Sequence, residues 1–262
     1  MSAVRLAGVR NRALFANFFR RELQTRYLGS TSALLWAFLQ PLLLLAVYHF
    51  VFTSIFRASA FGGTSFLLFV AVALWPWLAA QDGLARATVA VPAYGALIRK
   101  VAFPHEIVVY ASVAATLTLQ LAGYLVVLVA LFAFGEPVRF EGLLLAIPVW
   151  AVLALGITGL ALALSALQVF VRDVEHILAP LLTILMYVTP ILYPIAMVPE
   201  GVRPWVAANP FGWLVGRLRD ALIDGRIALQ WGDAVALAVA VAVFLAGRWI
   251  FRKLSPHFED FV

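Results

Sequence analysis

Cysteine is absent from the 262-residue chain. Disulfide bonds, thiolate nucleophiles and cysteine-ligated metal sites are therefore excluded. Lysine is almost absent too, because Lys100 and Lys253 are the only two, and each follows an arginine. A P-loop needs Gly-Lys-Ser/Thr to bind nucleotide phosphates, so this motif is excluded as well.

Charged residues are also scarce. They make up 12% of the chain, whereas hydrophobic residues make up 64%. Soluble domains usually carry about 25% charged residues. The composition therefore predicts an integral membrane protein without room for a catalytic domain. The net charge of +6 does not indicate a nucleic-acid partner, because the basic residues are spread over chain ends and turns, as membrane topology requires.

Metal-ligand patterns are weak. A zinc-binding helix would need a second histidine four residues after His105, where Val109 stands. Asp173, Glu175 and His176 lie close together in sequence, but no further ligand set accompanies them. A solvated turn is the better interpretation, and we expect no metal and no cofactor in this chain.

Long apolar runs alternate with short polar segments. A helix of about 20 apolar residues crosses the hydrocarbon core of a bilayer. Six such runs occur, at residues 33–56, 65–87, 107–134, 142–166, 177–198 and 231–251. We predict an all-α polytopic protein with a six-span transmembrane domain over residues 33–262, preceded by a cytoplasmic segment over residues 1–32.

The basic residues indicate the orientation. With six spans both termini lie on one side, and most of the 19 lysines and arginines fall on that side. The six on the opposite side are Arg57, Arg139, Arg203, Arg217, Arg219 and Arg226. Because basic residues in short loops stay in the cytoplasm, both termini are predicted to be cytoplasmic.

Residues 10–27 show helical periodicity. Apolar residues fall on one broad arc and most polar residues on the other. The apolar arc comprises Leu14, Phe15, Phe18, Phe19 and Leu23, and the polar arc Asn17, Arg20, Arg21 and Gln24. This pattern predicts an amphipathic helix at the interface with membrane lipids.

Residues 92–106 form a polar segment between two apolar runs. Pro92 and Pro104 bracket about three turns of predicted helix, because the residue before a proline is biased away from helical geometry. Its apolar side consists of Leu97, Val101 and Phe103. Two interpretations remain open: a helix on the lipid headgroups, or a docking helix for a soluble partner.

Several motifs, in order and over nearly the whole chain, together resemble one family. They are Arg26-Tyr27-Leu28-Gly29, residues 35–41 (Leu-Trp-Ala-Phe-Leu-Gln-Pro), Leu97-Ile98 with Lys100 and Phe103-Pro104, Val169 with Arg172-Asp173-Val174 and His176, residues 189–194 (Thr-Pro-Ile-Leu-Tyr-Pro), Pro199-Glu200 and Asn209-Pro210. This set resembles the membrane subunits of polysaccharide ABC exporters of the O-antigen (Wzm) and teichoic-acid types.

The resemblance implies a homodimer in the bacterial inner membrane, with two copies of a separate ATPase that binds ATP and Mg. The implied activity is export of a lipid-linked glycan from the inner leaflet. It favours docking of the ATPase on the loop at 92–106, and it implies short re-entrant helices within residues 199–230. The expected docking residues are Leu97, Arg99, Lys100, Val101 and Phe103.

The same resemblance suggests residues that contact the cargo. Arg26 and Tyr27 are expected near the diphosphate headgroup of the lipid carrier. Aromatic faces hold sugar rings weakly and repeatedly, which suits a sliding polymer. The expected glycan path comprises Trp36, Gln40, Tyr48, Phe52, Trp75 and Trp77. The alternative is an aromatic belt at the two headgroup levels.

Two other functions remain open at this point. One is an ABC exporter of a smaller lipid or drug, with the same architecture. The other is a polytopic membrane glycosyltransferase, which would need acidic residues in a loop facing the sugar donor. The outer turns at 57–64 and 135–142 are short and poor in such residues.

Overall fold

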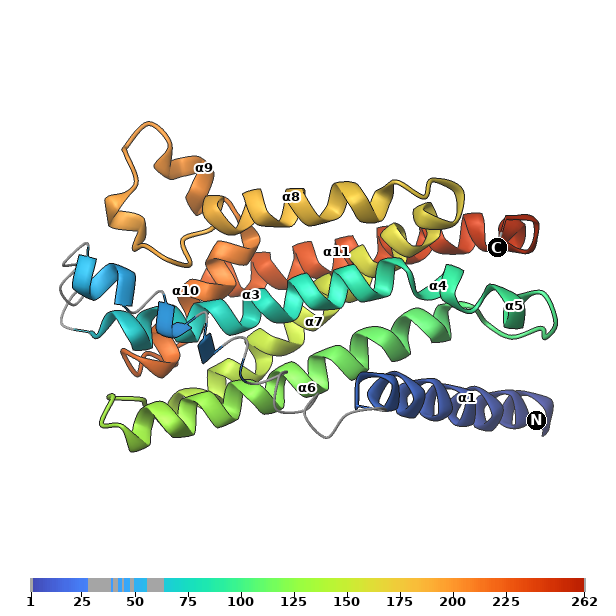
Figure 1. Cartoon of the computed structure of the whole chain (residues 1–262), viewed down its shortest axis with the longest axis horizontal. Coiled ribbons are helices and arrows are strands. Elements are labelled where there is room, and N and C mark those ends of the chain that lie inside the picture. Colours follow the sequence, from blue (N-terminus) through green and yellow to red (C-terminus); the bar gives the residue numbers. More distant parts are fainter. Residues whose placement is uncertain are drawn as a thin grey trace.

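The computed structural model is an elongated bundle of helices (Figure 1). It describes residues 2–27, 39, 42–43, 45–47, 50–55 and 64–261, without the side chains of 2–10, 26–27 and 52–53. Both chain termini lie at one end of the bundle. We call this end, with residues 92–106, 171–173 and 255–261, the terminal end. The opposite end, with residues 135–141 and 189–230, is the distal end.

Four helices in the described residues are long and apolar enough to cross a membrane. These helices are α3 (Phe66–Thr88), α6 (Glu106–Ala133), α7 (Leu143–Phe170) and α11 (Trp231–Leu254). They confirm, to within a few residues, four of the helices expected from the apolar runs. The part of the chain that the structure describes is therefore helical, and the chain is a multi-pass membrane protein.

The other two expected spans differ. Helix α8 (Val174–Val188) has 15 residues, where 177–198 was expected. At 1.5 Å per residue it is about 22 Å long, less than the roughly 30 Å of a bilayer core. It ends because Thr189 precedes Pro190 and takes an extended conformation (ψ 137°). The expected span 33–56 lies mostly outside the described residues, which include the π-helical turn η1 (Val51–Ile55). The count of six spans stays a prediction.

Helix α3 is the central element. Its sequence is apolar on all sides from Phe66 to Ala80, which is typical of a helix surrounded by protein, and it packs against α6, α7, α8 and α10 (Pro210–Leu222). Ser65 caps its N-terminus by accepting a hydrogen bond from the backbone N–H of Leu68 (3.2 Å). The Ser65 hydroxyl also donates to Glu136 (2.6 Å), which fixes the start of α3 to the turn after α6.

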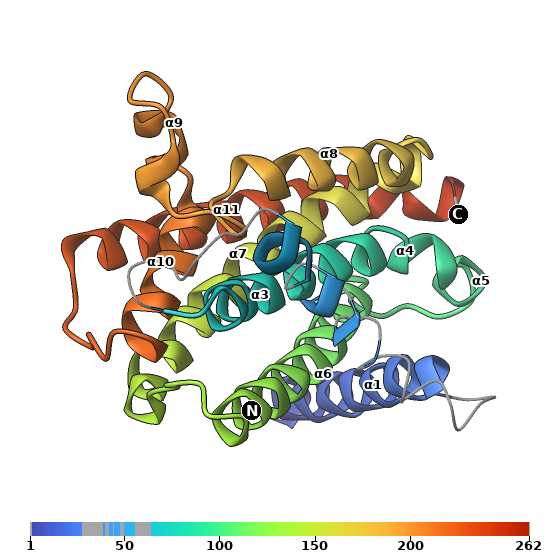
Figure 2. The ribbon, with the colours of Figure 1, turned by 60° about the vertical axis from the view of Figure 1, so that its left-hand side comes forward.

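Helices α7 and α11 lie side by side along much of their length (Figure 2). Gly159 and Gly247 make this approach possible, because a Cβ atom on Gly247 would overlap the carbonyl oxygen of Gly159. Small residues at such crossings let helix backbones pack closely inside membranes.

Helix α1 (Ser2–Tyr27) lies outside the bundle against α6 (Figures 1 and 2). The expected helix over 10–27 is confirmed, and it starts earlier. Its aromatic arc faces protein: Phe18 is buried, and Phe15 and Phe19 are half-buried against the core. The arc was expected to face membrane lipids, but the start of α6 and the loop at 92–106 pack against it. Placement of α1 at the membrane interface stays a prediction.

The loop at 92–106 is less regular than expected. In place of three continuous turns between Pro92 and Pro104 there are two short helices, α4 (Ala90–Ala93), which begins before the loop and includes Pro92, and α5 (Gly95–Ile98). Tyr94 interrupts the helix with non-helical geometry (φ −105°, ψ 14°). Phe103 precedes Pro104 and is not helical either, as its position before a proline predicts.

Short helices form the distal end. Helix α10 begins where Asn209 accepts a hydrogen bond from the N–H of Phe211 (3.0 Å), and the Asn209 amide donates to Thr189 (2.9 Å). The other short helices are η2 (Phe140–Gly142), η3 (Ile195–Met197) and α9 (Arg203–Ala207), with η4 (Ser255–Asp260) at the terminal end. Residues 199–230, where short re-entrant helices were expected, thus contain short helices.

Candidate functional site

The loop at 92–106 presents a small exposed surface at the terminal end. Arg99 and Lys100 are exposed, and the Val101 side chain is 48% exposed. Leu97 is half-buried, and Phe103 is buried at 9% exposure. Of the three apolar residues expected to anchor a partner, Val101 alone is freely accessible in this chain.

Phe103 packs against α1. Its ring lies 5.6 Å from the ring of Phe18, and the Tyr94 ring lies 5.1 Å from Phe18 in an edge-to-face arrangement. The Tyr94 hydroxyl donates to Glu22 (3.2 Å), and the Arg21 guanidinium lies 5.0 Å from the Tyr94 ring centre. Burial and the nearby Glu22 carboxylate raise the pKa of Tyr94 to about 12. The loop and α1 are therefore joined through aromatic and polar contacts.

The chain terminus joins the same cluster. The His105 ring lies 5.3 Å from Phe103 and stacks 5.9 Å from Phe258. Phe258 is fully buried and also meets the ring of Phe251 (5.3 Å). Burial lowers the pKa of His105, against the opposing influence of Glu259. A displacement of the loop would therefore reach both α1 and the C-terminal segment.

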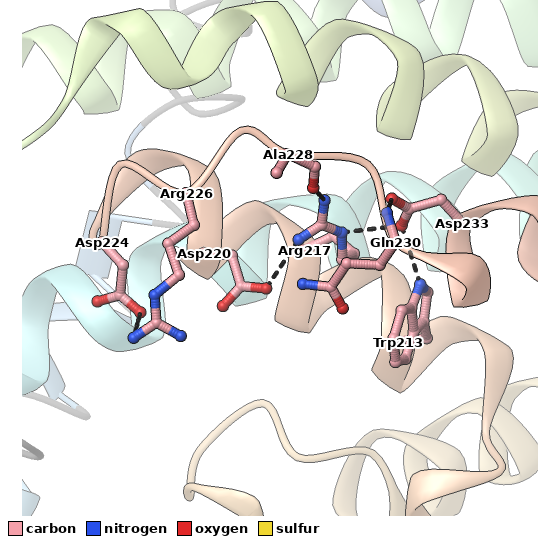
Figure 3. Close-up of polar contacts among 8 residues, drawn as sticks. All are labelled: Trp213, Arg217, Asp220, Asp224, Arg226, Ala228, Gln230 and Asp233. Carbon is pink, nitrogen blue, oxygen red and sulfur yellow. Dashed lines mark hydrogen bonds and ion pairs between the residues drawn. The ribbon is translucent and has the colours of Figure 1, made fainter.

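Arg217 of α10 organises the distal end (Figure 3). Its side chain is 2% exposed, and it donates to Asp233 (2.8 Å), Asp220 (2.9 Å) and the carbonyl of Ala228 (2.6 Å). Asp233 lies in the first turn of α11, so these bonds join α10, the segment after it and α11. A buried arginine is tolerated because its charge is paired and its donors are bonded.

Asp233 has further partners. Its carboxylate accepts hydrogen bonds from the indole N–H of Trp213 (3.1 Å) and from the backbone N–H of Gln230 (2.9 Å). The second of these completes a capping box at the start of α11. One carboxylate thus caps α11 and holds α10.

Arg219 joins α10 to the rest of the bundle. Its guanidinium donates to the carbonyls of Pro190 (2.7 Å), Ile191 (2.6 Å) and Phe69 (3.2 Å), and it lies 3.4 Å from the Phe69 ring centre. Helix α10 is therefore fixed to α3 and to the chain after α8 by one cation.

Both arginines border a distal cavity of about 1030 Å³. Its other polar lining includes Asp224, Arg226 and Gln230. Asp224 and Arg226 form an exposed ion pair (3.4 Å), whereas Arg217 and Arg219 use their donors inside the chain. The buried arginines therefore shape the cavity, and its exposed ion pair is open to a solute.

Trp75 and Trp77 lie in α3 and are buried at 1% and 4% exposure. The Trp77 ring lies 5.1 Å from Phe211 of α10, edge to face. Both indoles are therefore covered by protein in this chain. Of the other expected cargo contacts, Trp36, Gln40 and Tyr48 lie outside the described residues, and the side chains of Phe52, Arg26 and Tyr27 do as well.

Of the solvated turn expected at residues 172–176, residues 172–173 form an exposed turn and residues 174–176 begin α8, where His176 and Glu175 approach each other at 3.8 Å. Within residues that the structure describes, no three Asp, Glu or His side chains gather as metal ligands.

The Arg217 network was missed by sequence reasoning, which counted Arg217 and Arg219 only as topology signals. Their position in an amphipathic, otherwise apolar stretch was the available signal, because charges buried in membrane proteins need partners.

Comparison of the sequence with known proteins agrees with this architecture. Residues 13–223 match the ABC-2 type transporter family. The chain is 29% identical over 252 residues to the O-antigen export system permease protein RfbA of Myxococcus xanthus, with 95% of each chain covered. It is 26% identical over 241 residues to a protein of that name from Klebsiella pneumoniae, with 92% of this chain and 91% of the relative covered. Because the family match spans most of its length, the chain belongs to the ABC-2 type transporter family.

Proposed function

We propose that this chain is the permease subunit of an ABC exporter that moves a lipid-linked, O-antigen-like polysaccharide out of the bacterial cytoplasm across the inner membrane. The observation that carries this proposal is the similarity, along 92% or more of the chain, to proteins named O-antigen export permeases. A transport subunit carries no catalytic site of its own, and we assign ATP and Mg to a partner ATPase.

We propose that two copies of the chain assemble with two copies of the ATPase, which docks on the loop at 92–106. The exposed Arg99, Lys100 and Val101 support this surface. Phe103 would not touch the ATPase but would transmit movement of the loop to α1, because it links the loop to α1 through Phe18. This assignment separates residues that touch the partner from one that transmits the motion.

Val101→Asp is expected to lower the apparent affinity for the ATPase at least tenfold, since a charge replaces an apolar contact at a partly buried interface, at a cost of about 1.4 kcal/mol or more. The matched control is Val202→Asp, at the distal end, where the side chain is 52% exposed. Pull-down of the ATPase with each purified variant measures the difference. Equal retention of the ATPase by both variants would remove Val101 from the docking surface.

We also propose six spans with both termini in the cytoplasm. The order of the described helices supports this, because α1 packs at the terminal end, α3 starts at the distal end, and α8 runs between the two ends (Figure 1). The end of α1 and the start of α3 therefore lie at different levels along the bundle. We assign the connection between them to the expected span 33–56, and we propose that the short helices within residues 199–230 are re-entrant from the outer side.

Single cysteines test this topology directly, since the chain has none of its own. Cysteines replacing Ala96 and Glu259 are expected to react with a membrane-impermeant maleimide only from the cytoplasmic side. One replacing Gly201, where the structure leaves open space, is expected to react only from outside. Labelling of Ala96→Cys and Gly201→Cys from the same side would contradict the proposed topology.

For the cargo we keep Arg26 and Tyr27 as proposed headgroup contacts. Trp36, Gln40, Tyr48 and Phe52 remain the proposed glycan path along the first span. Trp77 belongs to that path only in a state in which α10 has moved, since Phe211 packs against its ring, and Trp75 only in a state in which it is no longer buried. The aromatic-belt interpretation remains the alternative for the first-span residues.

Deletion of the gene in its native cells tests the proposed cargo. The expected result is an intracellular accumulation of lipid-linked polysaccharide with loss of the surface polymer, and restoration of both by the intact gene. A deletion strain with normal surface polysaccharide but a missing smaller lipid or exported drug would support the alternative exporter.

A further inference from the structure

A second cavity, of about 470 Å³, lies at the terminal end. It is bounded by α1, the start of α6 and the last turns of α11. Arg12, Arg248 and Arg252 contribute its positive charge, and Phe15, Pro104 and Ile107 contribute apolar surface. The cavity therefore combines a basic part with an apolar part, and neither the docking surface nor the expected cargo residues account for it.

Glu106 holds two of the arginines in place. Its carboxylate accepts hydrogen bonds from the Nε atoms of Arg252 (2.6 Å) and Arg248 (3.4 Å) and from the Tyr110 hydroxyl (3.0 Å). Each arginine uses Nε for this contact, and the terminal nitrogens have no partner among the described residues. Three arginines and one carboxylate leave an excess of positive charge, and Glu106 holds the guanidinium groups of Arg248 and Arg252 in place.

Trp249 indicates the depth of this cavity in the membrane. It follows Arg248 in α11, its side chain is 63% exposed, and Lys253 lies 5.0 Å from its ring centre. One turn earlier, Leu245 is 57% exposed on the same helix. Exposed tryptophan near a basic helix end marks the headgroup level, with exposed leucine in the acyl region beyond it. The arginines are thus at the depth of lipid phosphates.

We propose that this cavity binds the phosphate group of a membrane lipid, with Arg12, Arg248 and Arg252 around the phosphate and the first part of the lipid chain against Phe15 and Ile107. Guanidinium groups match phosphate oxygens in charge and geometry, and basic pockets between transmembrane helices bind anionic headgroups. The proposal does not depend on the identity of the exported cargo. Bound there, a lipid would connect α1 to α6 and α11.

Two lipids share this chemistry: a phospholipid of the bilayer and the diphosphate of an isoprenyl carrier. Native mass spectrometry of the delipidated full-length chain, in a neutral detergent, can compare four probes. Dilauroyl phosphatidate and farnesyl diphosphate carry both phosphate and chain. Dilauroylglycerol lacks the phosphate, and inorganic pyrophosphate lacks the chain. Phosphatidate or farnesyl diphosphate is expected to bind tightest, one per chain, and the tighter of the two identifies the source.

Arg12→Ala and Arg20→Ala form the matched pair of variants. Both remove one exposed arginine from α1, but only Arg12 lines the cavity. Loss of a charge-assisted hydrogen bond is expected to weaken binding of the better lipid probe about tenfold in Arg12→Ala, and less than about twofold in Arg20→Ala. Arg12 makes no ion pair within the described part of the chain, so thermal stability should be unchanged.

Three results would overturn the proposal. Equal weakening by the two variants would mean diffuse attraction to basic α1. Dilauroylglycerol bound as tightly as phosphatidate would mean a purely apolar cavity, and pyrophosphate bound as tightly as both lipid probes would mean a site for free anions.

Discussion

Arg217→Met is expected to lower the free energy of unfolding by about 3 kcal/mol. The substitution removes the cation of a buried ion pair and leaves the carboxylate partner charged but without a counter-ion. Asp233 keeps Trp213 and Gln230 as donors, which limits the loss. For a chain of this size the expected drop in Tm is about 6–12 °C. Thermal unfolding in detergent measures it, and export should fall with the amount of folded protein.

Arg226→Met is the matched control, since it removes the same charge from the same end of the bundle. Arg226 is 70% exposed and pairs with Asp224 at 3.4 Å. Exposed pairs contribute about 0–1 kcal/mol, so Tm should change by less than about 4 °C. Equal, small changes in both variants would show that the Arg217 network does not hold the distal end together.

Gly247→Ala is expected to have a comparable effect. The added methyl group would overlap the carbonyl oxygen of Gly159, and a backbone atom inside a helix cannot move aside as a side chain can. Relief requires α7 and α11 to separate along their interface. Overpacking of this kind typically costs about 1–3 kcal/mol, and a backbone overlap belongs at or above the upper end. Tm and the yield of folded protein both report the change.

Gly216→Ala is the corresponding control. Gly216 lies within α10, and a Cβ atom there meets nothing within 4 Å among the described residues. Alanine is favoured over glycine in a helix by about 1 kcal/mol, so this variant should be neutral or slightly more stable. A Gly247→Ala protein as stable as Gly216→Ala would contradict the close α7–α11 contact.

The long helices were predictable because lipid and protein interior both require uninterrupted apolar sequence. Helix α6 was expected over 107–134 and spans Glu106–Ala133. The end of α8 was not predicted, although Pro190 and Pro194 follow it, because hydropathy continues past the point at which the backbone leaves the helix. Local proline geometry, not hydrophobicity, sets that boundary.

Side-chain placement was harder to predict than helices. Periodicity identified the aromatic arc of α1 correctly, but it could not say whether Phe18 faces lipid or protein, because both are apolar. The same ambiguity applies to Phe103, which the pattern made a partner anchor and which contacts Phe18. Periodicity could not predict the Arg217–Asp233 pair at all. The two residues are 16 apart in sequence, and they come together only because the chain turns between α10 and α11.

Transport by the purified chain tests the central claim most directly. The chain is reconstituted into liposomes with its partner ATPase and a fluorescent lipid-linked polysaccharide, oriented so that added ATP reaches the ATPase. The proposed function predicts ATP-dependent movement of the polymer to the opposite leaflet, measured by protection from a glycosidase outside, and less movement with Val101→Asp at the same ATPase concentration. Polymer that stays in place while ATP is hydrolysed, in liposomes that instead translocate a smaller lipid, would contradict polysaccharide export.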